Sequence, residues 1–278
     1  MMSLLDEYLT YLRAERKSRR TVDERAYYLR GADFDLQQLC GVGLEEASST
    51  EIARYMAEYG NHWRPWTACT YYTHLNAFYR WAVDRDEPYL LFNPMRRIAK
   101  PKTPHTVAEP ATTQDITIAL AMSSGQWHTI ILLAAYGSLR CADIYYLDRR
   151  DVTQESIRVR GGKGGKDAVL PCHPLIWAQM APLSPGWVVR DPRPSSEQAL
   201  SASARRYFDR LGLRRLHLHG MRHWYATSLL QAGVDVRAVQ TLMRHSNLAT
   251  TAGYLHVTDA QRSSAIATLP VLTPGEAA

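Results

Sequence analysis

The chain has 278 residues, a formal net charge of +6 and an isoelectric point near 9.2. This length is typical of two domains, and the excess of basic residues favours a polyanionic partner. No hydrophobic signal core precedes the first helical pattern, and the apolar run 130–135 is too short to span a bilayer. The four cysteines show neither metal spacing nor disulfide density, so we expect a cytoplasmic protein without a membrane span.

Helical patterns fill the chain up to about residue 98. Apolar residues recur at helical spacing in three stretches, 4–12, 50–59 and 66–83. Thr21 and Glu24 form a candidate capping box for another helix. Basic residues, interrupted by Tyr27 and Tyr28, crowd the first thirty positions, and they either track a DNA backbone or form a solvated face. We expect a helical domain over residues 1–98.

A basic, proline-rich stretch follows, from Asn93 to Pro104. Proline interrupts helices and strands, so this composition is typical of an interdomain linker. We place the linker over residues 99–112 and the second domain over residues 113–278.

Early in that second domain, Arg140 follows the apolar run 130–135. Burying a guanidinium without an anion is costly. Arg140 is therefore expected either to pair with an acid such as Asp143 or to bind a phosphate.

A β-hairpin is expected over residues 157–171, where alternating apolar and polar residues flank a glycine-rich turn. The turn holds Lys163 and Lys166, two of only five lysines in the chain. Lysine gives up a proton where arginine does not, so a catalytic lysine and a solvated turn lysine are both open. The turn lacks the Gly-Lys-Ser/Thr ending of a nucleotide-binding loop, and no nucleotide is expected.

Near the C-terminus, apolar spacing predicts a helix over 219–232 with Gly233 at its C-cap, a second helix capped by Asp235, and a third beginning near Leu248. On the first of these, His219 and Arg222 project from nearly the same side. Histidines at 217, 219 and 223 suggest zinc, but glycine stands where the zinc-protease pattern needs glutamate, so no metal is expected.

The spacing of these residues resembles that of the tyrosine recombinases, the phage integrase family. The chain has the family's histidine-x-x-arginine box at His219 and Arg222, and Arg244 precedes His245 where the family has glycine-histidine. Tyr254, nine residues after His245, matches the nucleophilic tyrosine.

Besides Arg244, three further positions depart from the family pattern. Ser138 stands between glycine and leucine in the segment before Arg140, Asp143 replaces a glutamate, and Ala168 replaces an arginine that often follows the second hairpin lysine.

The resemblance implies a metal-free and cofactor-free catalytic set in which the tyrosine attacks the scissile phosphate, two arginines hold its oxygens, two histidines handle protons and the lysine protonates the leaving oxygen. The residues that match this set are Arg140, Lys163, His219, Arg222, His245 and Tyr254.

It also implies a mainly α fold with a small β-sheet or hairpin: a helical, SAM-like core-binding domain followed by an α+β catalytic domain. The implied partners are double-stranded DNA at recombination sites, a four-way junction, three further copies of the chain in a homotetramer, and accessory DNA-bending proteins, at the nucleoid in the cytoplasm. The implied function is site-specific integration and excision of DNA.

Four alternatives are open. Within the same chemistry, the enzyme could resolve chromosome or plasmid dimers, or swivel single strands as a type IB topoisomerase does. The helix–Gly233–helix segment also resembles a non-catalytic helix-turn-helix DNA-binding protein. A metal-dependent nuclease would require clustered carboxylates, which the sequence does not show.

Overall fold

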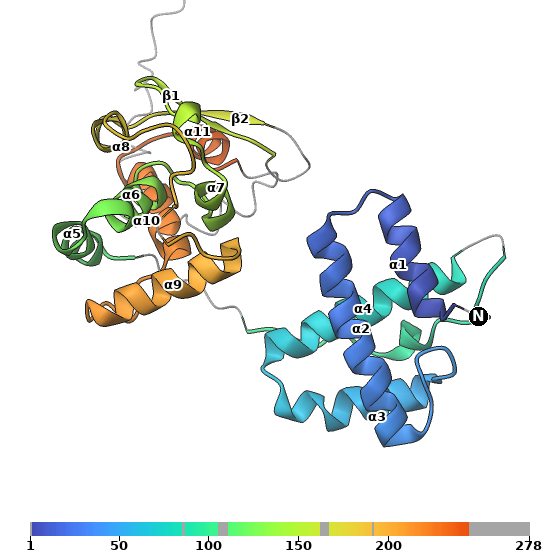
Figure 1. Cartoon of the computed structure of the whole chain (residues 1–278). Helices are drawn as coiled ribbons and strands as arrows, with labels where there is room; N and C mark the ends of the chain where they lie inside the picture. The colour runs from blue at the N-terminus through green and yellow to red at the C-terminus, as the bar shows by residue number, and fades with distance from the viewer. Residues whose placement is uncertain (1, 85–86, 105–110, 162–166, 191, 245–278) are drawn as a thin grey trace, which may run out of the picture. The chain divides into compact units, whose positions relative to one another are not determined.

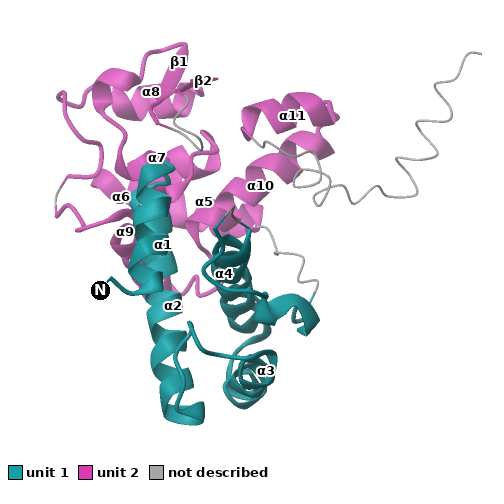
Figure 2. Cartoon of the chain, turned by 90° about the vertical axis from the view of Figure 1, so that its right-hand side faces the viewer, with its two compact units in different colours: residues 1–106 teal, residues 107–278 magenta. Residues whose placement is uncertain are grey.

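In the computed structural model the chain forms two compact units, residues 1–106 and residues 107–278 (Figure 2). The structure describes residues 2–84, 87–104, 111–161, 167–190 and 192–244. None of the helices in these ranges is both long and apolar enough to cross a membrane.

All the regular secondary structure in the described part of unit 1 is helical. It contains four α-helices and two 3-10 turns: α1 (Leu4–Ala14), α2 (Arg19–Cys40), α3 (Ser49–Glu58), η1 (Gly60–His62), α4 (Pro65–Val83) and η2 (Pro94–Arg97). The apolar face predicted for the first helix is buried, because Leu4, Tyr8 and Leu12 of α1 all lie in the core.

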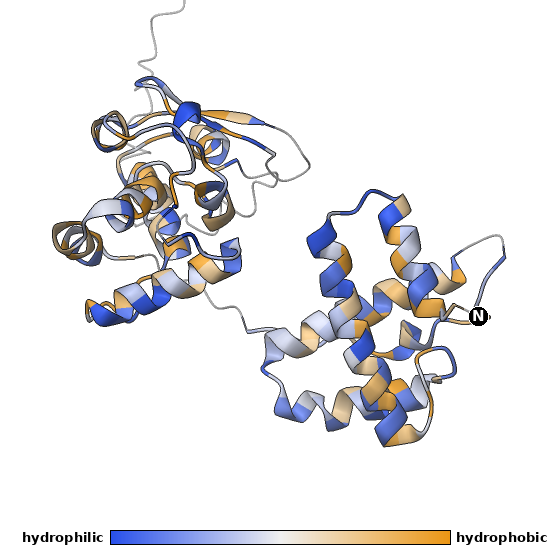
Figure 3. Cartoon of the chain, in the orientation of Figure 1, coloured by the Kyte–Doolittle hydropathy of each residue, from blue (hydrophilic) through white to orange (hydrophobic). Residues whose placement is uncertain are grey.

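Helix α2 starts earlier than the sequence suggested. Its N-cap is Ser18, whose hydroxyl accepts a hydrogen bond from the Thr21 backbone N–H at 3.1 Å. The predicted capping box at Thr21 and Glu24 is therefore wrong, since both residues lie inside the helix. The turn between α1 and α2 is strongly hydrophilic (Figure 3).

The proline-rich stretch is partly built into unit 1. Asn93 caps η2, and Met95 is 1% exposed within the core of the unit. Packing of this apolar side chain therefore draws residues up to about Ile98 into the helical unit.

Unit 2 surrounds a central helix, α6 (Gly125–Ala135), whose residues from Thr129 to Ala135 are all buried. Helix α6 packs most extensively against α10 (Leu218–Gln231), α5 (Thr113–Met122) and α8 (Pro174–Met180), and it also contacts α7 (Cys141–Tyr145) (Figure 1). The remaining elements are η3 (Arg149–Asp151), α9 (Glu197–Arg210) and α11 (Val236–Leu242).

The expected hairpin is present. Strands β1 (Ser156–Val159) and β2 (Ala168–Pro171) pair antiparallel, with Ser156 opposite Pro171 and Val159 opposite Ala168. The prediction of a mainly α fold with a small sheet is confirmed.

Candidate active site

Helix α10 carries two of the predicted site residues. His217 is its N-cap, and the helix ends before Gly233, whose φ of 82° is the left-handed conformation that favours glycine. Within the helix, His219 and Arg222 are three positions apart, and both line one cavity of about 600 Å³.

Arg140 reaches the same cavity from the turn between α6 and α7. This turn is tight: a Cβ on Gly137 would lie 2.8 Å from the carbonyl oxygen of Leu133, and Ser138 has a φ of 51°. Arg140 then caps α7, and its backbone N–H donates to the Asp143 carboxylate at 2.8 Å. The sharp turn thus aims the arginine at the cavity.

Arg222 is 1% exposed and holds two chain segments together. Its guanidinium donates to the carbonyl oxygens of Ser138 and Met243. Because Met243 packs with Val239 on Ala226 of α10, the end of α11 is fixed beside the turn that precedes Arg140.

Arg244 makes a further link between these segments. It has a left-handed backbone, with a φ of 51°, and its guanidinium forms an ion pair with Asp143. Its carbonyl oxygen accepts a hydrogen bond from Arg140 Nη2 at 3.4 Å. The acid expected to pair with Arg140 therefore binds its backbone N–H and pairs with a different arginine.

The cavity is strongly basic. Three arginines and two histidines line it, and no Asp or Glu is among the described lining residues: Leu139, Arg140, Cys141, Gln198, Ser201, Ala202, Arg205, His217, Leu218, His219 and Arg222. A concave surface of one sign concentrates ligands of the opposite charge. Such a cavity suits a phosphodiester.

Both histidines in the cavity are held neutral near pH 7. Desolvation lowers the pKa of His219, and the charges of Arg222, His217 and Arg140 lower it further. Desolvation also lowers the pKa of His217, reinforced by Arg205. A neutral imidazole can accept or donate a proton at the reacting phosphate.

Lys163, His245 and Tyr254 lie outside the described residues, as does the helix expected near Leu248. The structure therefore brings together Arg140, His219 and Arg222 of the predicted set.

One ion pair links the two strands on either side of the glycine-rich turn, since Arg158 of β1 is 2.8 Å from Asp167 beside β2. A second ion pair, between Arg160 and Asp151 at 2.6 Å, links the end of β1 to η3. The Gly161 N–H also donates to Asp167 at 3.0 Å. These contacts fix the base of the hairpin.

Sequence reasoning missed two residues of the cavity. His217 was considered only as a metal ligand, although its place just before the His219 box could have indicated a cap. Arg205 projects from α9, whose sequence shows nothing that distinguishes it from a solvated arginine. Within the described ranges, no three His, Cys, Asp or Glu side chains cluster as metal ligands do.

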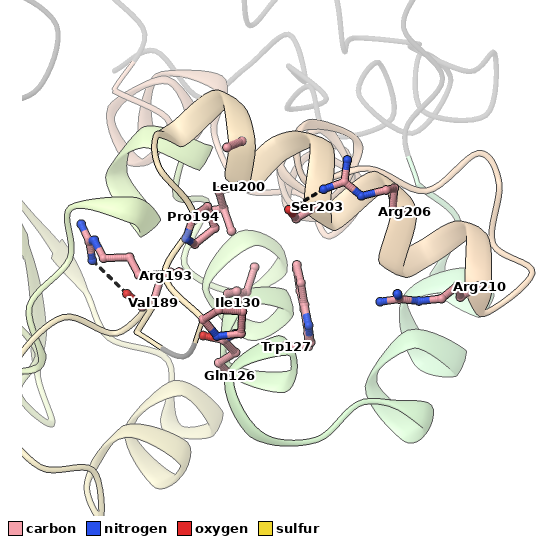
Figure 4. A pocket seen from close by; sticks show the side chains of 12 residues that line it. Gln126, Trp127, Ile130, Val189, Arg193, Pro194, Leu200, Ser203, Arg206 and Arg210 are labelled. Carbon is pink, nitrogen blue, oxygen red and sulfur yellow. Dashed lines mark hydrogen bonds between the residues drawn. The ribbon is translucent and has the colours of Figure 1, made fainter.

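A second cavity, of about 370 Å³, lies against another side of α9 (Figure 4). Trp127, Ile130 and Leu200 supply apolar walls, and Arg206 and Arg210 add positive charge. Among the described residues, none of the predicted site residues lines this second cavity.

The known proteins to which this chain is similar are integrases and tyrosine recombinases. Residues 111–261 match the model of the phage integrase family. Tyrosine recombinase XerA of Thermococcus onnurineus is 29% identical over 276 residues, which cover 92% of this chain and 91% of the relative. Tyrosine recombinase XerC of Escherichia coli O157:H7 is 30% identical over 207 residues, covering 66% and 67%. A lambda integrase tetramer bound to a Holliday junction shares the fold, with a TM-score of 0.69, 17% identity and coverage of 90% and 76%.

Proposed function

Because the chain belongs to the phage integrase family of tyrosine recombinases, enzymes that cleave and rejoin DNA strands through a tyrosine-linked intermediate, we propose that it catalyses site-specific integration and excision of DNA. The observation that carries this proposal is the convergence of Arg140, His219 and Arg222 on one cavity lined, among the described residues, by no carboxylate.

The proposed nucleophile is Tyr254. Its hydroxyl oxygen forms a bond to the scissile phosphorus while the bond from phosphorus to the 5′ oxygen breaks, which leaves a 3′-phosphotyrosyl link. His219 and His245 assist the loss of the phenolic proton, and Lys163 protonates the departing 5′ oxygen. The intermediate keeps the free energy of the phosphodiester, so rejoining requires no ATP.

The two arginines have a common role. Arg140 and Arg222 hold the non-bridging oxygens, where negative charge increases in the transition state. Because Arg222 also binds the carbonyls of Ser138 and Met243, its guanidinium is held in place before DNA arrives. Preorganised charge of this kind needs no rearrangement during the reaction.

For the domains, we propose a helical DNA-binding domain over residues 1–98, a linker over 99–112 and a catalytic domain over 113–278, which together clamp duplex DNA. The basic residues around the α1–α2 turn support the first assignment. Exposed cations there would neutralise backbone phosphates.

Strand exchange between two DNA sites requires four cleavages and a four-way junction. We therefore propose that four copies assemble on the DNA, with accessory DNA-bending proteins as further partners. The lambda integrase tetramer on a Holliday junction supports this assembly. A DNA substrate supports a location at the nucleoid in the cytoplasm, which is part of the same proposal.

A nicked suicide duplex tests the chemistry. The duplex carries the site selected by the protein from a random-sequence pool, and the nick lets the cleaved fragment diffuse away. We expect a covalent protein–DNA adduct with the wild type, and binding without adduct for Tyr254→Phe. An adduct that persists in Tyr254→Phe would overturn the assignment of the nucleophile.

Resolution of chromosome or plasmid dimers is the second candidate, because the XerA likeness extends over 92% of the chain. Plasmids that carry the selected site either on two separate molecules or as direct repeats on one molecule separate these two candidate functions. An enzyme that integrates and excises DNA recombines sites on separate molecules as well as direct repeats within one molecule, whereas a dimer resolvase acts only on direct repeats within one molecule. A type IB topoisomerase relaxes supercoils without rearranging either substrate.

A further inference from the structure

His217 presents a hydrogen-bond donor to the catalytic cavity, the cavity of about 600 Å³ that Arg140, His219 and Arg222 also line. Its Nδ1 accepts the backbone N–H of Gly220 at 2.8 Å, so in the neutral ring the proton is on Nε2. The ring lies so close to Gly220 that a Cβ there would be 3.1 Å from Cε1. The cap therefore fixes both the orientation of the ring and the nitrogen that carries its proton.

Arg205 lines the same cavity from α9. Its side chain keeps 54% of its surface exposed, and its Nε is 3.7 Å from Asp209. A surface pair at this distance holds an arginine weakly, so the guanidinium can reach an anion. Its charge also lowers the pKa of His217, which places the two groups near each other.

The sides of α9 have different surroundings. Ser201 and Arg205 line the catalytic cavity, whereas Ser203, Arg206 and Arg210 face the other cavity (Figure 4). Adjacent arginines at 205 and 206 thus serve different surfaces. This difference supplies a control of equal charge on the same helix.

The catalytic cavity holds more donors than one phosphodiester uses. A phosphodiester has two non-bridging oxygens, and the proposed mechanism assigns them to Arg140 and Arg222, with His219 beside the phenol. Each strand of duplex DNA carries one phosphate per 3.4 Å of helix axis, so a neighbouring phosphate follows the scissile one closely. His217 and Arg205 are the cavity's remaining cationic or imidazole groups among the described residues.

We propose that the His217 Nε2–H and the Arg205 guanidinium bind the phosphate adjacent to the scissile one on the same strand, forming a second phosphate subsite. This inference rests on the proposed recombinase function. The subsite sets the register of the strand, because backbone contacts position DNA without reading its sequence. With the neighbour held, the scissile phosphorus is placed for attack.

Methylphosphonate substitution tests the subsite. The nicked suicide duplex is made with one phosphate at a time replaced by a neutral methylphosphonate, and the rate of adduct formation is measured. The protein variants are His217→Ser, which keeps a capping side chain, and Arg205→Gln. Each variant should slow adduct formation on unmodified DNA by roughly 10- to 100-fold, as expected for loss of a hydrogen bond to a charged group.

The decisive result is that, at one phosphate position only, the loss of adduct formation caused by the protein variant and the loss caused by the methylphosphonate are not additive. When the phosphate next to the scissile one is already neutral, His217→Ser and Arg205→Gln should cause little further loss. At other phosphates, the rate loss from the protein substitution and the rate loss from the methylphosphonate should multiply. If these two rate losses multiply at every phosphate, His217 and Arg205 share no phosphate, and the subsite is wrong.

Two matched controls accompany these variants. His173 caps α8 in the same way, since its Nδ1 accepts from the Leu175 N–H at 3.2 Å, and it does not line the catalytic cavity. Arg206 is exposed and lines the other cavity. His173→Ser and Arg206→Gln should leave adduct formation unchanged, and losses equal to those of the test variants would also overturn the subsite.

The outcomes separate this inference from the proposed function. If wild-type protein forms no adduct on unmodified DNA, the recombinase function fails. If the adduct forms but no phosphate shows non-additivity, only the subsite fails. Arg205 is exposed, so Arg205→Gln tests the subsite even if His217→Ser does not fold.

Discussion

Replacing Arg244 by glycine tests what stabilises the turn at the C-terminal end of α11. The residue has a left-handed φ of 51°, a conformation that glycine adopts without strain. Its guanidinium is nevertheless retained in an ion pair with Asp143, in which the two side chains are 12% and 9% exposed. Arg244→Gly therefore relieves backbone strain and removes the ion pair at once, and the stronger of these two effects decides whether the protein gains or loses stability.

The loss of the ion pair is the stronger effect. Removing one partner of a buried ion pair costs about 3–5 kcal/mol, and the partial exposure here favours the lower value, about 3 kcal/mol. Glycine relieves the strain of the left-handed backbone, which raises the free energy of unfolding by about 1 kcal/mol. Arg244→Gly should lower the free energy of unfolding by about 2 kcal/mol, which reduces the Tm of unit 2 by about 4–8 °C.

Differential scanning calorimetry of the full chain without DNA measures the effect. A double-mutant cycle with Asp143→Asn should show that the two losses are less than additive. Arg16 is the control, because it has a φ of 52° and an exposed side chain in unit 1. Arg16→Gly should not destabilise the protein. An Arg244→Gly protein that melts at or above the wild-type temperature would refute the reasoning, because strain relief would then dominate.

Two other predictions concern folding. Gly137→Ala should destabilise the protein by about 2 kcal/mol in urea unfolding, because its Cβ would collide with Leu133, whereas Gly60→Ala has open space and should not. Burial, reinforced by the charge of Arg25, lowers the pKa of His74 to about 4, while the unfolded chain binds this proton near pH 6.5. Stability should therefore fall by roughly 3 kcal/mol as the pH drops from about 6.5 to 4, and an equally steep fall in His74→Gln would show that His74 is not its source.

Local patterns predicted much of the fold. Alternation and glycines located the hairpin, and Asp235 caps α11 as expected, with its carboxylate accepting from the Arg237 and Ala238 N–H groups. Each of these features depends on residues that are close in sequence. The start of α2 was misplaced because Ser18 and Thr21 are both good caps, and only the folded helix selects between them.

Long-range contacts could not be read in the same way. Arg244 pairs with Asp143 across 101 residues, and Arg222 binds the carbonyl of Ser138 across 84. Nothing in the local sequence indicates which arginine an acid will meet. Family spacing indicated Arg140, His219 and Arg222, which line one cavity, whereas Arg205 could be found only from the fold.

Peptide mapping of the covalent adduct tests the central claim most directly. The adduct is digested with nuclease and trypsin, and the modified peptide is sequenced by mass spectrometry. Tyr254 is the only tyrosine between His245 and Arg262, the tryptic peptide that follows Arg244. We predict a nucleotide joined through its 3′ phosphate to Tyr254, and the adduct should form equally well when a chelator removes divalent metal ions. Attachment to another residue, or a 5′ linkage, would contradict the account.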